Sequence, residues 1–203
     1  MAIMETHSRH IFISSKPCSS LQPCPVSHLH TVNHRWRPPD PGVMKLNVDA
    51  SYLSPTDEAS VAGVCQDSTG HLIDGFASSI RASSALQAEA IALNSALKFL
   101  LQRGLETDRI IVESDSLVCV EAICDPEKRP WELRPILDET LTMKLRCPNL
   151  QIIHCHRGAN ALADCLVKAH RASLLPPNWV SQLPIFLQDL VLSKLPVNSL
   201  ICA

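Results

Sequence analysis

Between residues 45 and 51 apolar and polar positions alternate strictly along the chain. One face carries Leu46, Val48 and Ala50, and the other carries Lys45, Asn47 and Asp49. A period of two residues is typical of a β-strand with one face against a core. Two further apolar segments, 60–66 and 71–80, are joined by the sequence Asp-Ser-Thr-Gly, a short polar loop that favours a β-hairpin. The pattern therefore predicts an antiparallel meander of three strands.

A helical period replaces the alternation between residues 85 and 103. Its apolar stripe consists of Leu86, Ala90, Leu93, Leu97 and Leu100. Ser84 and Gln87 match a capping box, and Gly104 supplies a stop signal just beyond the stripe. These signals agree with one another, so this segment is the best-marked helix of the sequence.

The rest of the chain alternates short apolar stretches with helical patterns. We predict strands at 109–112 and 151–155, helices at 116–124, 132–146 and 159–171, and a turn at 126–130. The order β-β-β-α-β-α-α-β-α is typical of a mixed sheet with helices on its faces. The sequence thus predicts an α/β fold whose five-stranded mixed sheet has three antiparallel strands followed by two parallel ones, with helices on both faces.

Composition divides the chain into three parts. Residues 1–36 are rich in His, Ser, Pro and Cys and poor in acids, which favours a disordered leader and leaves an organelle transit segment as the alternative. The Pro-Pro-Asp-Pro-Gly run at 38–42 marks the start of folding, so we expect the domain over 37–172. Residues 173–203 form an extension, in which 184–194 is predicted to be amphipathic and to pack on the domain rather than to dock a partner.

Charge and cysteine content limit the classes of protein that fit. A net charge of −2 and 46% hydrophobic residues indicate an ordinary globular protein without an overall basic surface for nucleic acid, and we expect a monomer. Nine cysteines without C-x-x-C pairs favour reduced thiols, and no apolar run approaches the roughly 20 residues that span a bilayer. We therefore expect an intracellular, reducing location in the nucleus or cytoplasm, with an organelle as the alternative.

Four acidic residues occupy positions that a plain core does not require. Glu89 flanks the apolar stripe of its helix, although a rim residue that reaches water would fit the pattern equally well. Asp115 follows an apolar strand at its carboxyl end, where open α/β sheets bind ligands, and a helix cap is the alternative. Asp49 becomes buried if helices cover both faces of the sheet. Asp164 shares a helix face with Asn160, which by itself indicates a solvated side.

The segments around these acids resemble the four acidic motifs of type 1 ribonuclease H. The segments are KLNVDAS at 45–51, QAEA at 87–90, VESDS at 112–116 and NALAD at 160–164. They stand in the family's order and on the expected elements, over residues 36–171. The nearest likeness is to the plant ribonuclease H-like domain related to non-LTR retrotransposons, through WRPP at 36–39, Pro130-Trp131 and HRGAN at 156–160.

This resemblance implies a metal-dependent endonuclease that hydrolyses RNA in RNA–DNA hybrids. It implies two Mg²⁺ ions, replaceable by Mn²⁺, held by Asp49, Glu89, Asp115 and Asp164. In the family the residue at position 89 also lies near the ribose 2′-hydroxyl, the group that distinguishes RNA from DNA. A helper residue before the last helix completes the catalytic set; we assign it to His156, with His154 and Arg157 as alternatives.

Some features depart from the family pattern. Ala50 stands where the family commonly has glycine, and the basic helix-and-loop insertion that holds hybrids in some ribonucleases H is missing. Trp131 offers a stacking surface, although a buried aromatic side chain is the favoured interpretation. The alternative function is therefore a non-catalytic nucleic-acid-binding or interaction module derived from a retroelement. His154, Cys155 and His156 could also bind zinc, but no further paired ligands accompany them.

Overall fold

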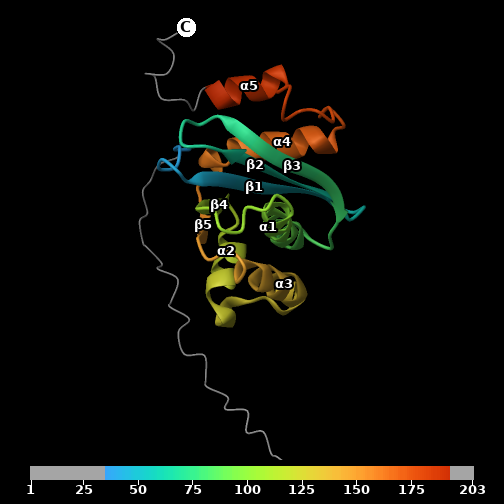
Figure 1. Ribbon diagram of the computed structural model, residues 1–203. Coiled ribbons are helices and arrows are strands. Elements are labelled where there is room, and N and C mark those ends of the chain that lie inside the picture. Colours follow the sequence, from blue (N-terminus) through green and yellow to red (C-terminus); the bar gives the residue numbers. More distant parts are fainter. Residues whose placement is uncertain (1–34, 193–203) are drawn as a thin grey trace, which may run out of the picture.

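The computed structural model describes residues 35–192, and in this part of the chain one sheet carries helices on both faces (Figure 1). The strands are β1 (Met44–Leu53), β2 (Glu58–Gln66), β3 (Leu72–Arg81), β4 (Ile110–Ser114) and β5 (Leu150–His154). The α-helices are α1 (Ala85–Gln102), α2 (Leu117–Cys124), α3 (Arg134–Lys144), α4 (Ala161–Arg171) and α5 (Ile185–Leu192). Short 3-10 helices are η1 (Pro126–Lys128), η2 (Trp131–Leu133) and η3 (Arg157–Ala159). Most of the predicted leader and the end of the extension lie outside the described residues.

The five strands follow the order β3-β2-β1-β4-β5. β1 pairs antiparallel with β2, β2 pairs antiparallel with β3, and the pairs β1–β4 and β4–β5 are parallel. This arrangement confirms the predicted mixed sheet. The last pair between β1 and β4 joins Val48 to Ser114, whereas β1 itself continues to Leu53. The sheet therefore opens at the carboxyl end of β4, directly beside Asp49.

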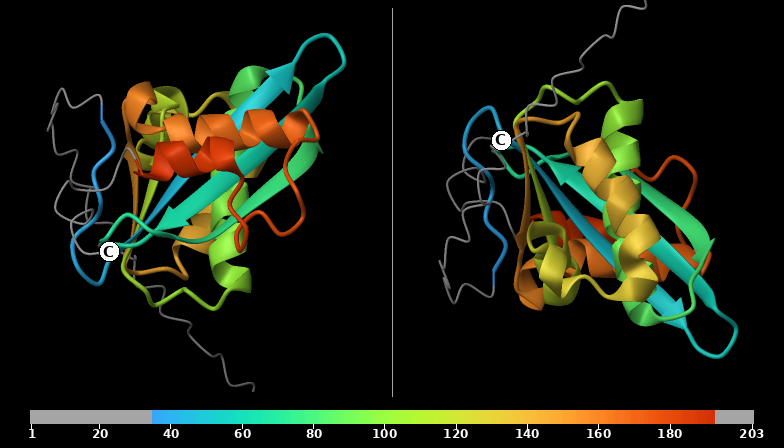
Figure 2. Two further views of the ribbon diagram at one scale, coloured as in Figure 1. Left: turned by 90° about the horizontal axis from the view of Figure 1, so that it is seen from above. Right: turned by 90° about the horizontal axis from the view of Figure 1, so that it is seen from below.

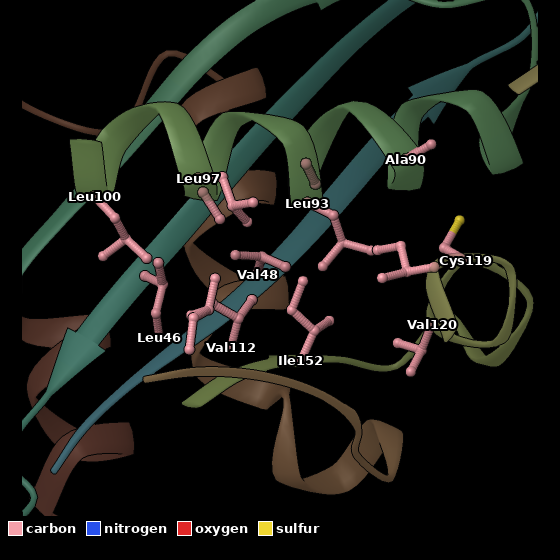
Figure 3. Close-up of a cluster of buried hydrophobic side chains, with 14 of the residues drawn as sticks. Leu46, Val48, Ala90, Leu93, Leu97, Leu100, Val112, Cys119, Val120 and Ile152 are labelled. Atoms are coloured by element: carbon pink, nitrogen blue, oxygen red, sulfur yellow. The ribbon is translucent and has the colours of Figure 1, made fainter. Parts of the chain in front are cut away.

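Two apolar clusters hold the helices on the sheet. On one face the leucines of α1 pack against Val48 of β1, Val112 of β4 and Ile152 of β5 (Figure 3). Each fully buried leucine contributes about 2 kcal/mol of transfer free energy to this layer. On the other face α4 and α5 lie side by side across the sheet (Figure 2), and Leu187 and Val191 of α5 are buried in that cluster. The predicted packing of the extension on the domain is therefore confirmed for α5.

Helix α1 begins where the capping signal predicts. The Ser84 hydroxyl accepts a hydrogen bond from the Gln87 backbone N–H at 3.1 Å, and the Gln87 side chain accepts one from the Ser83 N–H at 2.6 Å. Beyond the helix, Gly104 adopts a positive φ of 70°, a conformation that glycine tolerates best. These local signals fix the start of α1 and thereby place Glu89 one turn inside the helix, beside the open end of the sheet.

The structure contradicts the interpretation of Trp131 as a buried aromatic residue. Its side chain is 79% exposed, whereas Leu133, two residues later in η2, is fully buried in the α1-side cluster. A single turn of 3-10 helix presents only one of these two side chains to the core, and the leucine occupies that position. None of the described helices is long and apolar enough to cross a membrane.

Candidate active site

The four acids that the sequence singles out line one open cavity of about 330 Å³. Asp49 comes from β1, Glu89 from α1 and Asp164 from the first turn of α4. Asp115 directly follows Ser114, the last residue of β4, where the pairing between β1 and β4 ends. The cavity thus occupies the opening of the sheet at a carboxyl strand end, which is the usual place for ligand sites in α/β folds.

Three of the acids form a tight cluster. Asp49, Glu89 and Asp115 each offer a carboxylate oxygen, and these oxygens all lie within 4.8 Å of one another. Within residues 35–192 this is the one group of three or more carboxylate, imidazole or thiolate ligands close enough to share a metal ion. His154, Cys155 and His156 therefore do not form the alternative zinc site.

Burial and mutual repulsion make this cluster electrostatically unfavourable in the absence of a cation. Loss of solvation, together with the charges of Asp115 and Asp164, raises the pKa of Asp49 to about 7. Loss of solvation, together with the charges of Asp49 and Asp115, raises the pKa of Glu89 to about 8. Both carboxyl groups consequently hold protons at a pH where ordinary surface carboxyls are ionised, unless a bound cation replaces the protons.

One oxygen of the cluster has no protein partner. The Ala50 backbone N–H donates a hydrogen bond to the Glu89 carboxylate. The other carboxylate atom, Oε2, is buried and makes no hydrogen bond among the described residues. A buried carboxylate oxygen without a donor is costly, and a cation would remove that cost. Since hard divalent ions prefer carboxylate oxygens, the residues present fit Mg²⁺ or Mn²⁺.

Asp164 shares the cavity but stands outside the tight cluster. Its Oδ2 atom lies 2.7 Å from Nζ of Lys168, one turn later in α4. Lys168 also lines the cavity, and its charge partly counteracts the rise in the pKa of Asp49. The structure therefore brings all four predicted acids to one cavity, three as a cluster and the fourth beside them in an ion pair.

Of the three helper candidates, Arg157 lines the cavity. Its charge partly counteracts the rise in pKa of both Asp49 and Glu89. His156 instead caps η3 from the position before Arg157, where its Nδ1 accepts a hydrogen bond from the Gly158 N–H at 3.0 Å. His154 ends β5 with an exposed side chain, and neither histidine lines the cavity. The geometry thus favours Arg157 over the assigned His156 as the residue next to the acids.

The sequence pattern did not identify the polar residues that support Asp49 from within the protein. Asn160, expected on a solvated side, is completely buried, and its Nδ2 donates to the Val48 carbonyl at 2.9 Å and to Asp49 Oδ1 at 3.5 Å. Asn47, which donates to Asn160 at 3.2 Å, and Glu113, which accepts from Asn47, are also buried. The available signal was the polar face of β1, which implies buried polar partners once helices are expected on both faces of the sheet.

A family described as reverse transcriptase-like matches residues 47–170, the region that carries all four acids. The chain belongs to the reverse transcriptase-like family. Among curated proteins, none matches it significantly.

Solved structures add that this reverse transcriptase-like chain has a ribonuclease H-like fold. RNase H1 from the archaeon Halobacterium salinarum superposes with a TM-score of 0.56 at 20% identity, over 65% of this chain and 99% of that one. LC11-RNase H1, isolated from compost by a metagenomic approach, gives a TM-score of 0.59 at 24% identity, over 66% and 99%. The same enzyme in complex with RNA/DNA hybrid gives 0.56 at 24% identity, over 64% and 99%.

Proposed function

We propose that this chain is a metal-dependent endonuclease that hydrolyses RNA in RNA–DNA hybrids. The observation that carries the proposal is the cluster of three carboxylates, one with a buried and unpartnered oxygen, at the open end of a ribonuclease H-like sheet. Structural cores rarely retain such an arrangement, because unpaired buried charge is destabilising. An active site that binds metal ions, in contrast, needs carboxylates that have no cationic partner within the protein.

The four acids have different surroundings, and these suggest different roles. When divalent ions are bound, Asp49, the most buried of the acids at 5% exposure, would hold them together with Glu89 and Asp115. Asp164 serves as an exchangeable metal ligand, because its carboxylate already forms an ion pair with Lys168 and can exchange that ammonium group for a metal ion. Two bound divalent ions supply an activated water and stabilise the leaving oxygen of a phosphodiester.

Positive and hydroxyl-bearing side chains beside the acids suit a phosphodiester substrate. Arg157 and Lys168 line the cavity and offer charge to phosphate oxygens, while Ser51 and Ser116 add hydroxyl groups. A solved relative with the same fold was determined with an RNA/DNA hybrid, which supports a hybrid as the substrate class. We therefore propose Arg157 as the helper residue that contacts the substrate or product, in preference to His156.

A second function is favoured by a different observation. The net charge is −2, and the connection between α2 and α3 contains only η1 and η2 where some ribonucleases H carry a basic helix. Weak electrostatic attraction to polyanions is the expected consequence. The second candidate is thus a non-catalytic nucleic-acid-binding or interaction module. For either function we propose descent from a non-LTR retrotransposon of the plant kind, on the strength of the WRPP and HRGAN motifs.

The decisive experiment incubates the purified full chain with a hybrid whose RNA strand is labelled, in the presence of Mg²⁺ or Mn²⁺. We expect cleavage of the RNA strand only, a loss of at least about 100-fold in Asp49→Asn and Asp115→Asn, and no change in Glu139→Gln, an exposed acid of α3. Wild-type cleavage no faster than that of Asp49→Asn would exclude the enzyme. Gel-shift assays with hybrid, duplex DNA and duplex RNA would then decide whether the chain binds nucleic acid.

The remaining proposals concern the setting of the domain. We propose that residues 37–172 form the functional unit, and that the protein is a monomer in a reducing, intracellular compartment. Light scattering of the purified chain measures its mass in solution. A tagged full-length chain in cells shows whether it stays in the nucleus or cytoplasm or enters an organelle.

A further inference from the structure

Five buried side chains form a polar network on the face of β1 that carries Asp49. None of them is more than 8% exposed: Trp36, Lys45, Asn47, Glu113 and Asn160. Burying this much polar surface is costly unless every group finds a partner. The apolar side of the same strand shows that β1 does not need polar residues to pack. The network therefore calls for an explanation beyond stability.

Three hydrogen bonds run through the network toward the cavity. Nε1 of Trp36 donates to Oδ1 of Asn47 at 2.8 Å. Nδ2 of Asn47 donates to Oδ1 of Asn160 at 3.2 Å. Nδ2 of Asn160 then donates to Oδ1 of Asp49 at 3.5 Å, and more closely to the carbonyl of Val48 at 2.9 Å. A side chain that precedes the sheet is thereby connected to a proposed metal ligand.

These hydrogen bonds form a relay from Trp36 through Asn47 and Asn160 to Asp49. The chemistry of the groups fixes which group donates and which accepts at each step. An indole N–H can only donate and a carboxylate can only accept, whereas a side-chain amide can do both. Asn47 accepts from Trp36 and donates to Oε2 of Glu113 at 2.9 Å, so its amide has a single orientation. That orientation presents an N–H group to Asn160, whose own N–H group then faces Asp49. Trp36 and Glu113, through Asn47, and the Val48 carbonyl, which can only accept, thus agree on which end of Asn160 meets the carboxylate.

The charges of the network are balanced without the cavity. Nζ of Lys45 lies 2.8 Å from Oε1 of Glu113 and 5.4 Å from the ring centroid of Trp36. The same ammonium group donates to the carbonyl of Arg37 at 2.8 Å. Lys45 therefore neutralises Glu113 and also holds the segment that carries Trp36.

We propose that Trp36, Asn47 and Asn160 are positioning residues, which hold the Asp49 carboxylate in the orientation that a divalent ion requires. The inference rests on the proposed function, because it assigns these residues to the same metal site. Removing a side chain that hydrogen-bonds to a metal ligand typically lowers metal affinity by about 10- to 100-fold. Trp36 lies upstream of the family match at 47–170 and directly before the domain boundary expected at residue 37, so this proposal moves the start of the functional unit to residue 36.

The test measures Mn²⁺ binding to the full chain by isothermal titration calorimetry. We expect Asn160→Ala to weaken binding by about 10- to 100-fold, and Trp36→Phe, which removes the donor and part of the ring system but keeps an aromatic side chain, by about 3- to 10-fold. The matched control is Trp179→Phe, a buried tryptophan in the cluster of α4 and α5, and it should bind Mn²⁺ like the wild type. Equal affinity of Trp36→Phe and wild type would overturn the relay.

A double-mutant cycle in the metal-free protein gives an independent readout. If the relay is connected, Trp36→Phe and Asn160→Ala together should lower the thermal midpoint by less than the sum of their separate shifts, whereas Trp179→Phe and Asn160→Ala should be additive. Additivity of the first pair would overturn the relay. A wild-type chain that binds no Mn²⁺ would overturn the proposed function and the assigned role together, while the cycle would still decide whether the hydrogen bonds are coupled.

Discussion

Glu89 and Glu113 are two glutamates of one domain whose carboxylates have opposite surroundings. Glu113 is only 6% exposed, and each of its oxygens has a donor: Lys45 at 2.8 Å and Asn47 at 2.9 Å. Glu89 lies against Asp49 and Asp115, and its buried Oε2 has no donor among the described residues. The first acid carries its counter-charge within the fold, and the second does not.

This difference separates an acid that supports structure from one prepared for a ligand. A buried pair is tolerated because its partners remain in place after folding. A cluster of unpaired acids is tolerated only if its charge is neutralised by protons or by a cation that can enter and leave. Burial alone therefore does not identify a functional carboxylate; the absence of a built-in partner does.

Removing the charge of Glu113 should lower the free energy of unfolding, whereas removing the charge of Glu89 should not. Glu113→Gln leaves the Lys45 ammonium buried without a counter-charge, so we expect the free energy of unfolding to fall by about 3–5 kcal/mol. Glu89→Gln relieves repulsion and should leave stability unchanged or increase it. Urea unfolding at pH 8 without divalent ions measures both. Equal losses in the two variants would remove the distinction between them.

Divalent ions should stabilise the protein through the unpaired cluster. At a Mn²⁺ concentration 100 times the Kd, we expect the free energy of unfolding to rise by about 2.7 kcal/mol. Glu89→Gln should lose this increase because a metal ligand is missing, and the exposed Glu139→Gln should keep it. Thermal unfolding with and without Mn²⁺ provides the measurement. The same response in both variants would place the ion elsewhere.

The metal-free protein should become less stable as the pH rises. The pKa of Asp49 is raised from 3.8 to about 7, and that of Glu89 from 4.5 to about 8, so the native state holds more protons than the unfolded state between pH 4 and 8. The stability of the metal-free protein then falls through this window, because both carboxyl groups lose the protons that the folded state favours. Urea midpoints from pH 5 to 9 measure the slope, which should be shallower in Glu89→Gln. A stability that increases over this range would show that the acids have another partner.

Replacing Arg157, a cationic side chain that lines the cavity, should slow cleavage of the hybrid without abolishing it. Arg157 lies on the cavity wall, and its charge partly counteracts the rise in the pKa of Glu89. We expect Arg157→Ala to slow hybrid cleavage by about tenfold, equivalent to about 1.4 kcal/mol, and His156→Ala to slow it less. Single-turnover rates with saturating Mg²⁺ measure both. A larger effect of His156→Ala would return the helper role to the histidine.

Local sequence signals predicted much of the fold because they depend on few residues. The alternation around Asp49 predicted a strand with its acid on one face, and the capping signal at Ser84 predicted where α1 begins. The same kind of reasoning was wrong for Trp131 and Asn160. Periodicity identifies which residues share a face of an element, but it contains no information about what covers that face. α4 covers the polar face of β1, and this packing buries Asn160.

The periodicity and the turn signals of the chain predicted the order and type of the elements, and the resemblance of its acidic motifs pointed to four acids that line one cavity in the structure. The tertiary structure was needed to show which acids share a cluster and that Arg157, among the candidate helper residues, lines the cavity. It was also needed to show that Glu113, unlike Glu89, forms an ion pair with a lysine. The two kinds of feature depend on interactions that act over different distances along the chain. Strand alternation and helix caps act over a few neighbouring residues, whereas solvation and Coulomb energies depend on distances between groups far apart in the chain. Asp49 and Asn160 lie 111 residues apart in sequence, and only the folded chain brings them into contact.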